Sequence, residues 1–382
     1  MRIHTLTALL VAGLLAAVQP GRAADDPMAT AAASRTRGAD YLISVQREDG
    51  SWGKYSQPAI AALCVMALHD APATDTTARD AAIDRGMDYV LEYLDEGGAI
   101  RKEQRMYVVY KSSGYPVYTT SIALLAMAEL NRPEYIPVMK AARAYLKDVQ
   151  LGDPDARDRG GWGYDRGKRP DLSNTNWAAE ALHATEFLDR EPYAADESAA
   201  ETTEAMRRKL DSFLGQLQVM PPPPANLEME GDPAAGPDEG GFRYRVDSKL
   251  IATGSMTYAG LKSMLYARVD RSDRRVQGAL NFIRHHYDLD SNPGEGVGGL
   301  YYYLLTMTKA LDAVGMDRLQ LADERSVNWR HDMIAKFAGM QAADGSWTNK
   351  DGRYFEAVPE LASAYALIAL RIAATPRWQP AD

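Results

Sequence analysis

The sequence predicts an all-α protein in which six helical hairpins form two concentric rings, an (α/α)6 barrel. Three observations predict this fold class. A turn that joins glycine to a large apolar side chain recurs six times along the chain. A helical pattern lies on each side of every turn, and the two helices of each pair differ in polarity. Repeats of this kind bury their apolar faces only against their neighbours, so the internal repeat determines the architecture.

The clearest turns read Gln-x-x-Asp-Gly-Ser-Trp, and they end at Trp52 and at Trp347, at opposite ends of the chain. Between them lie Gly-Gly-aromatic turns at Trp162 and Phe242. Degenerate versions occur at Gly97-Gly98-Ala99-Ile100 and Gly298-Gly299-Leu300. Strand signals are thin, and short extended pieces are expected only within loops, around 108–110 and 242–244.

Each turn separates one amphipathic helix from one that is apolar on nearly every side. The run 142–149 keeps its charges on one face, whereas 122–128 is apolar throughout. A helix that is apolar all round is buried all round, so the second helix of each pair belongs to an inner ring that is almost entirely apolar. The predicted pairs are 33–45 with 58–69, 81–94 with 119–130, 138–149 with 175–188, 204–217 with 254–269, 275–287 with 300–314, and 327–340 with 358–372.

The first residues are typical of a secretory signal peptide. Arg2 supplies the positive start, 6–18 is an apolar run, and Gly21-Arg22-Ala23 offers small residues where a signal peptidase reads. Cleavage is expected after Ala23, with export to the periplasm or medium; a retained N-terminal anchor is the alternative. Residues 24–378 are expected to form one toroid domain. A Pro-rich acidic insertion at about 219–239 interrupts it, either as an inert loop or as a lid over one mouth of the barrel.

Charge and cysteine content exclude several classes of function. The formal charge of the 382-residue chain is −9, and loss of Arg2 and Arg22 makes it −11. So acidic a chain lacks the basic footprint of a nucleic-acid-binding protein. The apolar N-terminal run is too short to span a membrane, which leaves peripheral membrane contact open. The single cysteine, Cys64, lies in an apolar run and is expected in the core, so no metal or other cofactor is predicted.

The Gln-Gly-Trp turns resemble the glutamine–tryptophan repeats of squalene–hopene and oxidosqualene cyclases. The matching residues are Gln46, Gly50 and Trp52; Gln341, Gly345 and Trp347; and, with a longer spacer, Gln150, Gly160 and Trp162. The six-pair plan also resembles the β-subunits of protein prenyltransferases. The resemblance covers most of the mature chain and implies the toroid fold together with an isoprenoid-type ligand.

The motifs that carry the chemistry of these families are altered here. The acid motif Asp-x-Asp-Asp-Thr of the cyclases corresponds to Asp171-Leu172-Ser173-Asn174-Thr175, with Ser173 in the place of the proton donor. A serine hydroxyl is too weak an acid to protonate an alkene. The zinc site of the prenyltransferases corresponds to Gly240-Gly241-Phe242 followed by Asp247, but Ser248 stands where a cysteine is expected. Without a thiolate there is no zinc–thiolate mechanism.

Polar side chains gather at the start of one inner helix, at Asp171, Ser173, Asn174 and Asn176. Ser173 or Asn174 is expected to cap that helix. The same four side chains also suit a polar patch at a barrel mouth, where the helix dipole is positive. The two interpretations are compatible.

Tyrosines cluster before and at the start of the inner helices, and the chain contains 21 of them. They either fill a wedge-shaped core or line an aromatic cavity suited to cations, sugars or lipids. The residues expected to line a ligand cavity are Trp162, Tyr164, Ser173, Asn174, Asn176, Tyr118, Tyr258, Tyr301 and Tyr302, with Tyr107, Tyr110, Tyr115 and Tyr303 nearby.

Carboxylates near the expected mouth are candidates for acid–base catalysis, because glycoside hydrolases pair such groups. The candidates are Asp171, Asp165, Asp247 and Glu360, although spacing alone cannot pair them. The basic stretch 157–169, with Arg101, Lys102 and Arg105, is either an anion site or ordinary loop charge. Glu180-x-x-His183 has a di-metal spacing but lacks the second motif that such sites need, and His285-His286 is expected to face solvent.

Two functions from different classes remain. The first is an exported toroid protein that binds a bulky apolar or stacking ligand, or a protein partner, without cyclase chemistry. The second is an exported enzyme that acts on an isoprenoid lipid or a polysaccharide in the barrel cavity. The altered motifs favour the first.

Overall fold

The computed structural model describes residues 26–55, 57–107, 110–112, 114–194, 196–220, 239–248 and 252–375. The signal segment, most of the Pro-rich insertion and Val108-Val109 lie outside these ranges, as do the side chains of 104–107 and 110–112. The expectations placed on these segments therefore stay predictions.

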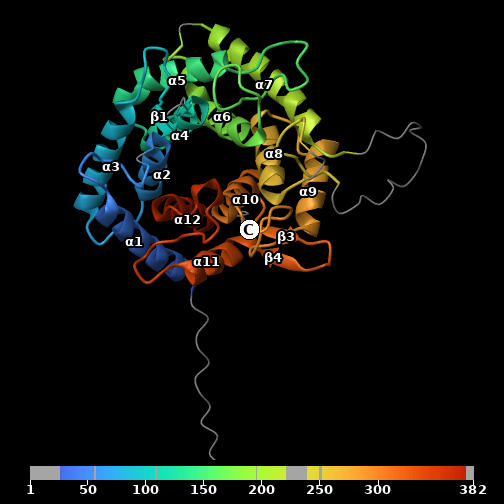
Figure 1. The fold of residues 1–382 in the computed structure, drawn as a ribbon. Helices are drawn as coiled ribbons and strands as arrows, with labels where there is room; N and C mark the ends of the chain where they lie inside the picture. The colour runs from blue at the N-terminus through green and yellow to red at the C-terminus, as the bar shows by residue number, and fades with distance from the viewer. Residues whose placement is uncertain are drawn as a thin grey trace, which may run out of the picture.

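The described residues contain twelve α-helices in two concentric rings, which confirms the predicted fold class (Figure 1). The outer ring consists of α1 (Pro27–Val45), α3 (Thr76–Leu91), α5 (Ile136–Asp148), α7 (Ser198–Leu217), α9 (Arg274–His285) and α11 (Trp329–Met340). The inner ring consists of α2 (Pro58–Leu68), α4 (Pro116–Leu130), α6 (Leu172–Ala184), α8 (Gly254–Tyr266), α10 (Leu300–Val314) and α12 (Pro359–Ala373).

The remaining elements are small. Strand β1 (Gln104–Tyr107) pairs antiparallel with β2 (Tyr110–Ser112), and β3 (Arg318–Gln320) pairs with β4 (Ser326–Asn328). Three short 3-10 helices, η1 (Pro133–Tyr135), η2 (Glu186–Asp189) and η3 (Arg353–Phe355), lie in connections between helices.

The inner ring closes because each inner helix packs on the next and α12 packs on α2. Every residue of α2 is buried, as its unbroken apolar sequence predicts. The outer helix α1 packs against α11 and α12, so the first helix of the fold seals the junction with the last hairpin. The outer helices end, and the inner helices begin, at one end of the barrel, which we call the mouth.

Four of the six recurrent turns fasten an outer helix to the next one. Gln46 Nε2 donates to the Gly50 carbonyl in its own turn (3.2 Å) and to the Ala82 carbonyl on α3 (2.9 Å). The same pair of hydrogen bonds is made by Gln150 to Gly160 and Met206, by Gln341 to Gly345 and Ser34, and by Gln218 to Gly240 and Arg275. The sequence pattern did not reveal Gln218 as a member of this set, because the insertion separates it from its glycine.

The turn tryptophans are buried between the two rings. Trp52, Trp162 and Trp347 are fully buried, and each indole N–H donates to a carbonyl of the preceding outer helix, at Leu42, Leu146 and Phe337 respectively. These side chains therefore hold the rings together. Trp162, which was expected to line a ligand cavity, belongs to this structural set.

The inner ring is less apolar than the sequence predicted. Glu180 on α6, Lys262 on α8 and Lys309 on α10 are buried within it. Asp312 on α10 is buried as well and accepts a bond from Arg330 on α11 (2.8 Å). Each of these side chains contacts a group of opposite sign on another helix, which the sequence of any single helix cannot show.

Candidate functional site

The start of α6 differs from the expected cap. Asp171, not Ser173 or Asn174, is the N-cap, and its carboxylate accepts bonds from the Asn174 backbone N–H and the Asn174 side-chain amide, both at 2.8 Å. Asp171 is the cap because α6 begins one turn earlier than its apolar pattern, which places the Asn174 N–H three residues after the aspartate. Ser173 instead points to Tyr302, with 3.2 Å between the two hydroxyl oxygens.

A second carboxylate caps another inner helix. Glu356, which follows η3, accepts from the Tyr302 backbone N–H at the start of α10 and from the Asn349 side-chain amide, both at 2.8 Å. Its side chain is completely buried. The sequence does not indicate Glu356, because its position just before a Pro-initiated inner helix gives no sign that it caps a different helix.

Both carboxyl groups are held in low-dielectric surroundings. Burial raises the pKa of Asp171 to about 6, against the hydrogen bonds from Asn174. Burial likewise raises the pKa of Glu356 above its ordinary value. Each group is engaged at both oxygens and at most 1% exposed, so neither reaches a ligand at the surface.

The raised pKa of Asp171 predicts a measurable pH dependence of stability. In the unfolded chain Asp171 titrates near its ordinary value of 3.8, but in the folded protein near 6. Between these pH values the folded state binds more protons, so stability increases as the pH falls from 6 to 4. We expect urea unfolding to show that wild type gains up to about 3 kcal/mol over Asp171→Asn across this interval.

The asparagine variant is a fair comparison, because Asn174 can reverse its amide. Its Oδ1 is buried and has no partner among the described residues, so it can accept from an amide at position 171. If the free energies of unfolding of the two proteins changed in parallel with pH, the raised pKa of Asp171 would be contradicted.

Four aromatic side chains contact one another in a closed cycle inside the inner ring of helices. We call the space enclosed by the inner helices the bore, and these four side chains the central aromatic cluster. The ring of Trp177 on α6 lies 6.1 Å from Tyr118 on α4 and 6.4 Å from Tyr302 on α10. Tyr302 lies 6.3 Å from Tyr365 on α12, and the hydroxyl of Tyr365 is 3.0 Å from that of Tyr118. These contacts join helices from both sides of the bore, so the central aromatic cluster occupies it.

Partly exposed tyrosines lie above the central aromatic cluster, on loops at the mouth. Tyr115 packs edge-on against Tyr164 at 5.2 Å, and the hydroxyls of Tyr164 and Tyr244 are 3.4 Å apart. Tyr164 is 41% exposed. The loops of successive repeats overlap here, because the Val117 N–H donates to the Tyr164 carbonyl and the Leu172 N–H to that of Tyr244.

Exposed aromatics also stand on the opposite side of the mouth, on the loops before α2 and α12. Tyr354 and Phe355 are 57% and 51% exposed, and Tyr55 packs edge-on against Phe355 at 5.5 Å. Tyr354 and Phe355 have positive φ angles of 58° and 64°, and Tyr115 has 53°. The left-handed region is costly for bulky side chains, so the backbone holds these aromatics at the mouth against a local penalty.

The expected ligand residues are thus only partly brought together. Tyr118, Ser173 and Tyr302 lie at the bore, and Tyr164 lies above them at the mouth. Asn174 and Asn176 are buried in the first turns of α6. Tyr258 packs on Tyr303 between helices, and Tyr301 packs on Phe337 of the outer ring. Tyr258 and Tyr301 are therefore buried between helices and are not available to a ligand at the mouth.

The catalytic candidates have separate partners. Asp247 pairs with Arg169 (2.5 Å) and Arg245 (2.9 Å), and Asp165 accepts from the Arg166 backbone N–H (2.7 Å). Glu360 lies in the first turn of α12, where its carbonyl faces the buried Cys64 thiol at 3.8 Å. Together with Asp171, these residues form no paired acid and base.

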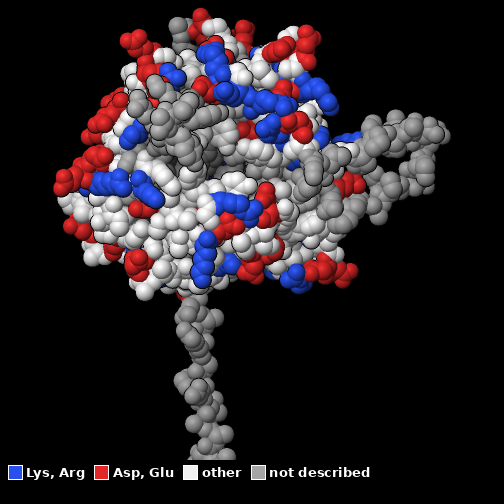
Figure 2. Space-filling model, in the orientation of Figure 1, with Lys and Arg blue, Asp and Glu red and all other residues white. Residues whose placement is uncertain are grey.

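Part of the basic stretch is neutralised by acids of this chain. Arg166 pairs with Asp148, Arg169 with Asp247, and Arg101 with Asp95. Figure 2 shows acidic side chains around the periphery of the ring and a band of Lys and Arg near α7. The pairing favours loop charge over an anion site at this position.

The histidines do not converge on a metal site. His183 stacks on Tyr266 at 4.4 Å, whereas Glu180, one turn earlier, points to lysines in the bore. His285 Nδ1 bonds the Asn281 carbonyl, and His286 packs on Phe282. Within the described ranges, no three His, Cys, Asp or Glu side chains come close enough together to hold a metal ion.

Comparison with solved structures shows the same fold in two classes of enzyme. A variant of the type II terpene cyclase MstE from Scytonema, bound to geranylgeranyl dihydroxybenzoate, superposes with a TM-score of 0.54 at 11% identity, covering 91% of this chain and 98% of that one. A glycosidase variant in complex with glucose superposes with a TM-score of 0.53 at 12% identity, covering 91% and 97%.

These likenesses show that the chain has the α/α toroid fold shared by these terpene cyclases and glycosidases. At this level of identity they show the fold alone. No family model and no curated protein matches the sequence. In the part of the chain that the structure describes, no helix is both long and apolar enough to cross a membrane.

Proposed function

We propose that this protein is an exported, non-cyclising α/α toroid that binds a glycan by stacking it on the aromatics of the mouth. The observation that carries the proposal is the set of aromatics held there at left-handed backbone positions, Tyr115, Tyr354 and Phe355. Such strain persists only where the surroundings impose it, and it concentrates at binding sites. Exposed apolar side chains gathered on one face are typical of an interaction site.

A saccharide fits this mouth better than an isoprenoid chain does. Tyrosine offers an apolar face and a hydroxyl, which matches the apolar face and hydroxyl rim of a sugar. A long alkyl chain would need a deep apolar cavity. The central aromatic cluster occupies the bore, however, and the charged groups Glu180, Lys262 and Lys309 lie near Trp177. The glucose complex of a glycosidase of the same fold supports the choice of ligand class.

The buried carboxyls support binding over catalysis. A glycosidase acid and base must both reach the scissile bond. Here Asp171 and Glu356 each cap a helix with both oxygens engaged. Neither the cyclase nor the glycosidase chemistry of the fold neighbours is therefore assigned to this chain.

The test is to measure retention of glycans and isoprenoid lipids on the purified mature chain, with Phe355→Gly as the variant. Glycine removes the ring and relieves the positive φ, so we expect glycan retention to fall at least tenfold while the free energy of unfolding stays equal or rises by about 1 kcal/mol. The matched control is Phe187→Ala, which removes a similarly exposed ring beyond the other end of α6. It should keep full retention.

Two outcomes would overturn the proposal. Retention of isoprenoids but not glycans would give the mouth a different ligand. Turnover of a glycan or lipid, abolished in Asp171→Asn, would make the protein an enzyme. Export is tested separately by N-terminal sequencing from a native host, where we expect the mature chain to begin at Ala24; an intact Met1 in the cytosol would contradict it.

A further inference from the structure

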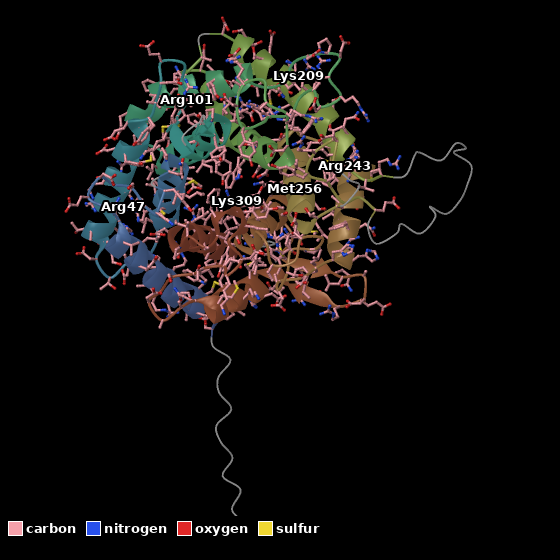
Figure 3. The ribbon with its side chains drawn as sticks, in the orientation of Figure 1. Arg47, Arg101, Lys209, Arg243, Met256 and Lys309 are labelled. Carbon is pink, nitrogen blue, oxygen red and sulfur yellow. The ribbon has the colours of Figure 1, made fainter. Side chains whose placement is uncertain are left out.

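Three charged side chains from three inner helices meet in the bore. Glu180 on α6 contacts Lys262 on α8, with 2.5 Å between Oε2 and Nζ, and Lys309 on α10, with 2.7 Å between Oε1 and Nζ. Figure 3 shows Lys309 in the middle of the ring, far from the labelled basic residues of the periphery. The helices α6 and α10 both flank α8 in the inner ring, so the contact between Glu180 and Lys309 passes along the inner side of α8, within the bore.

The cluster carries one positive charge too many. Two ammonium groups face a single carboxylate, and Lys262, Lys309 and Glu180 are only 1%, 7% and 8% exposed. Burial alone would raise the pKa of Glu180, but the two lysines outweigh it and bring the pKa to about 2. Both Glu180 oxygens are used, so the carboxylate has nothing further to offer the second lysine. An uncompensated charge in such surroundings is costly.

Several hydrogen-bond donors around the cluster have no partner among the residues that the structure describes. Each ammonium has three N–H groups, and the contacts to Glu180 engage one on each lysine. The Trp177 indole N–H is buried with no partner among the described residues, and its ring lies 4.8 Å from Lys309 Nζ and 5.8 Å from Lys262 Nζ. Lys309 and Glu180 keep 7% and 8% of their surface exposed, so a species about the size of a water molecule can touch part of each residue.

We propose that the bore contains a binding site for one small anion, a halide or a small oxyanion, held by the spare N–H groups of Lys262 and Lys309. The anion completes the charge balance of the Lys–Glu–Lys cluster. This site is separate from the aromatics of the mouth, and it does not depend on which ligand the mouth binds.

The competing account is that one lysine is neutral. Burial lowers the pKa of Lys262 to about 8, against the attraction of Glu180. A neutral Lys262 would leave a balanced Glu180–Lys309 pair and no anion. The two accounts differ in their response to anions and are separated by the following experiment.

The experiment measures thermal unfolding of the mature protein at pH 6.5 and constant ionic strength, while chloride or phosphate replaces a bulky sulfonate. We expect the wild-type Tm to rise with the small anion and to saturate. Lys309→Met leaves the neutral Glu180–Lys262 pair and should lose this response. Lys336→Met removes a surface lysine paired with the exposed Asp290 and should respond as wild type does.

A direct measurement covers the case in which a variant fails to fold. Wild-type crystals soaked in bromide should show an anomalous peak within hydrogen-bonding distance of the Nζ atoms of Lys262 and Lys309. The proposal is overturned if the bore has no such peak and the wild-type Tm does not respond to phosphate either, or if wild type and Lys309→Met respond equally to both anions.

Discussion

Replacing Glu180 by glutamine should reduce the free energy of unfolding by about 3–5 kcal/mol, the cost of removing one partner from a buried ion pair. The variant keeps the shape of the side chain and two lysines in the bore, but no opposing charge. Mutual repulsion then adds to desolvation. Urea unfolding at pH 6.5 measures the loss.

The pH dependence of this loss has a defined sign. The folded pKa of Lys262 lies near 8, below its ordinary 10.5, so the unfolded chain binds more protons between these values and stability rises with pH there. Without Glu180 the pKa of Lys262 in the folded protein falls further, so the free energy of unfolding of the variant begins to rise at a lower pH. The deficit of Glu180→Gln relative to wild type should therefore shrink as the pH is raised from 6 to 9.

Lys309→Met is the matched variant, because it leaves one lysine facing one carboxylate. It should cost about 1 kcal/mol or less, and the double variant then gives the coupling between positions 180 and 309. Equal costs for Glu180→Gln and Lys309→Met would contradict the excess positive charge assigned to the cluster.

The ring architecture could be predicted from the sequence because it depends on local signals. Trp52, Trp162 and Trp347 mark the turns, and the apolar runs mark the inner helices, within a few residues of their observed bounds. Each signal lies within one hairpin. The fold follows once the hairpins are counted, because each one needs a neighbour to cover its apolar face.

The bore could not be predicted in the same way. Lys262 and Lys309 each appear as a single charge in an apolar helix, and nothing local shows that both meet Glu180. That meeting depends on which inner helices face each other after the ring closes. Glu356 is a similar case, since it caps α10 although it precedes α12 in the chain.

At the mouth, the sequence placed residues in the chain but could not say which way their side chains face. The sequence indicated tyrosines at the inner-helix starts, yet it could not tell Tyr302, which faces the bore, from Tyr301, which faces the outer ring. A helix turns by about 100° per residue, so an error of one position selects a different layer. The left-handed backbone at Tyr354 and Phe355 has no sequence signal, because aromatic residues seldom adopt it.

Replacing Gly160 by alanine should reduce the free energy of unfolding by about 4 kcal/mol or more, at the upper end of single substitutions. Gly160 has φ of +97°, and a Cβ there would lie 1.9 Å from the Lys209 carbonyl oxygen on α7. The obstacle is backbone, so no side-chain rotation relieves it. The turn would have to move away from α7, which would also separate the two carbonyls that Gln150 joins.

Gly167→Ala, a few residues further along the same connection, separates the two causes of this loss. Gly167 also has a positive φ, +68°, but a Cβ there meets nothing within 4 Å. It should cost only the backbone penalty of about 1–2 kcal/mol. The difference between the two variants in urea unfolding therefore measures the close approach of the turn to α7. Equal losses would show that α7 yields to the added methyl group, and that the turn does not fix the spacing of the outer ring.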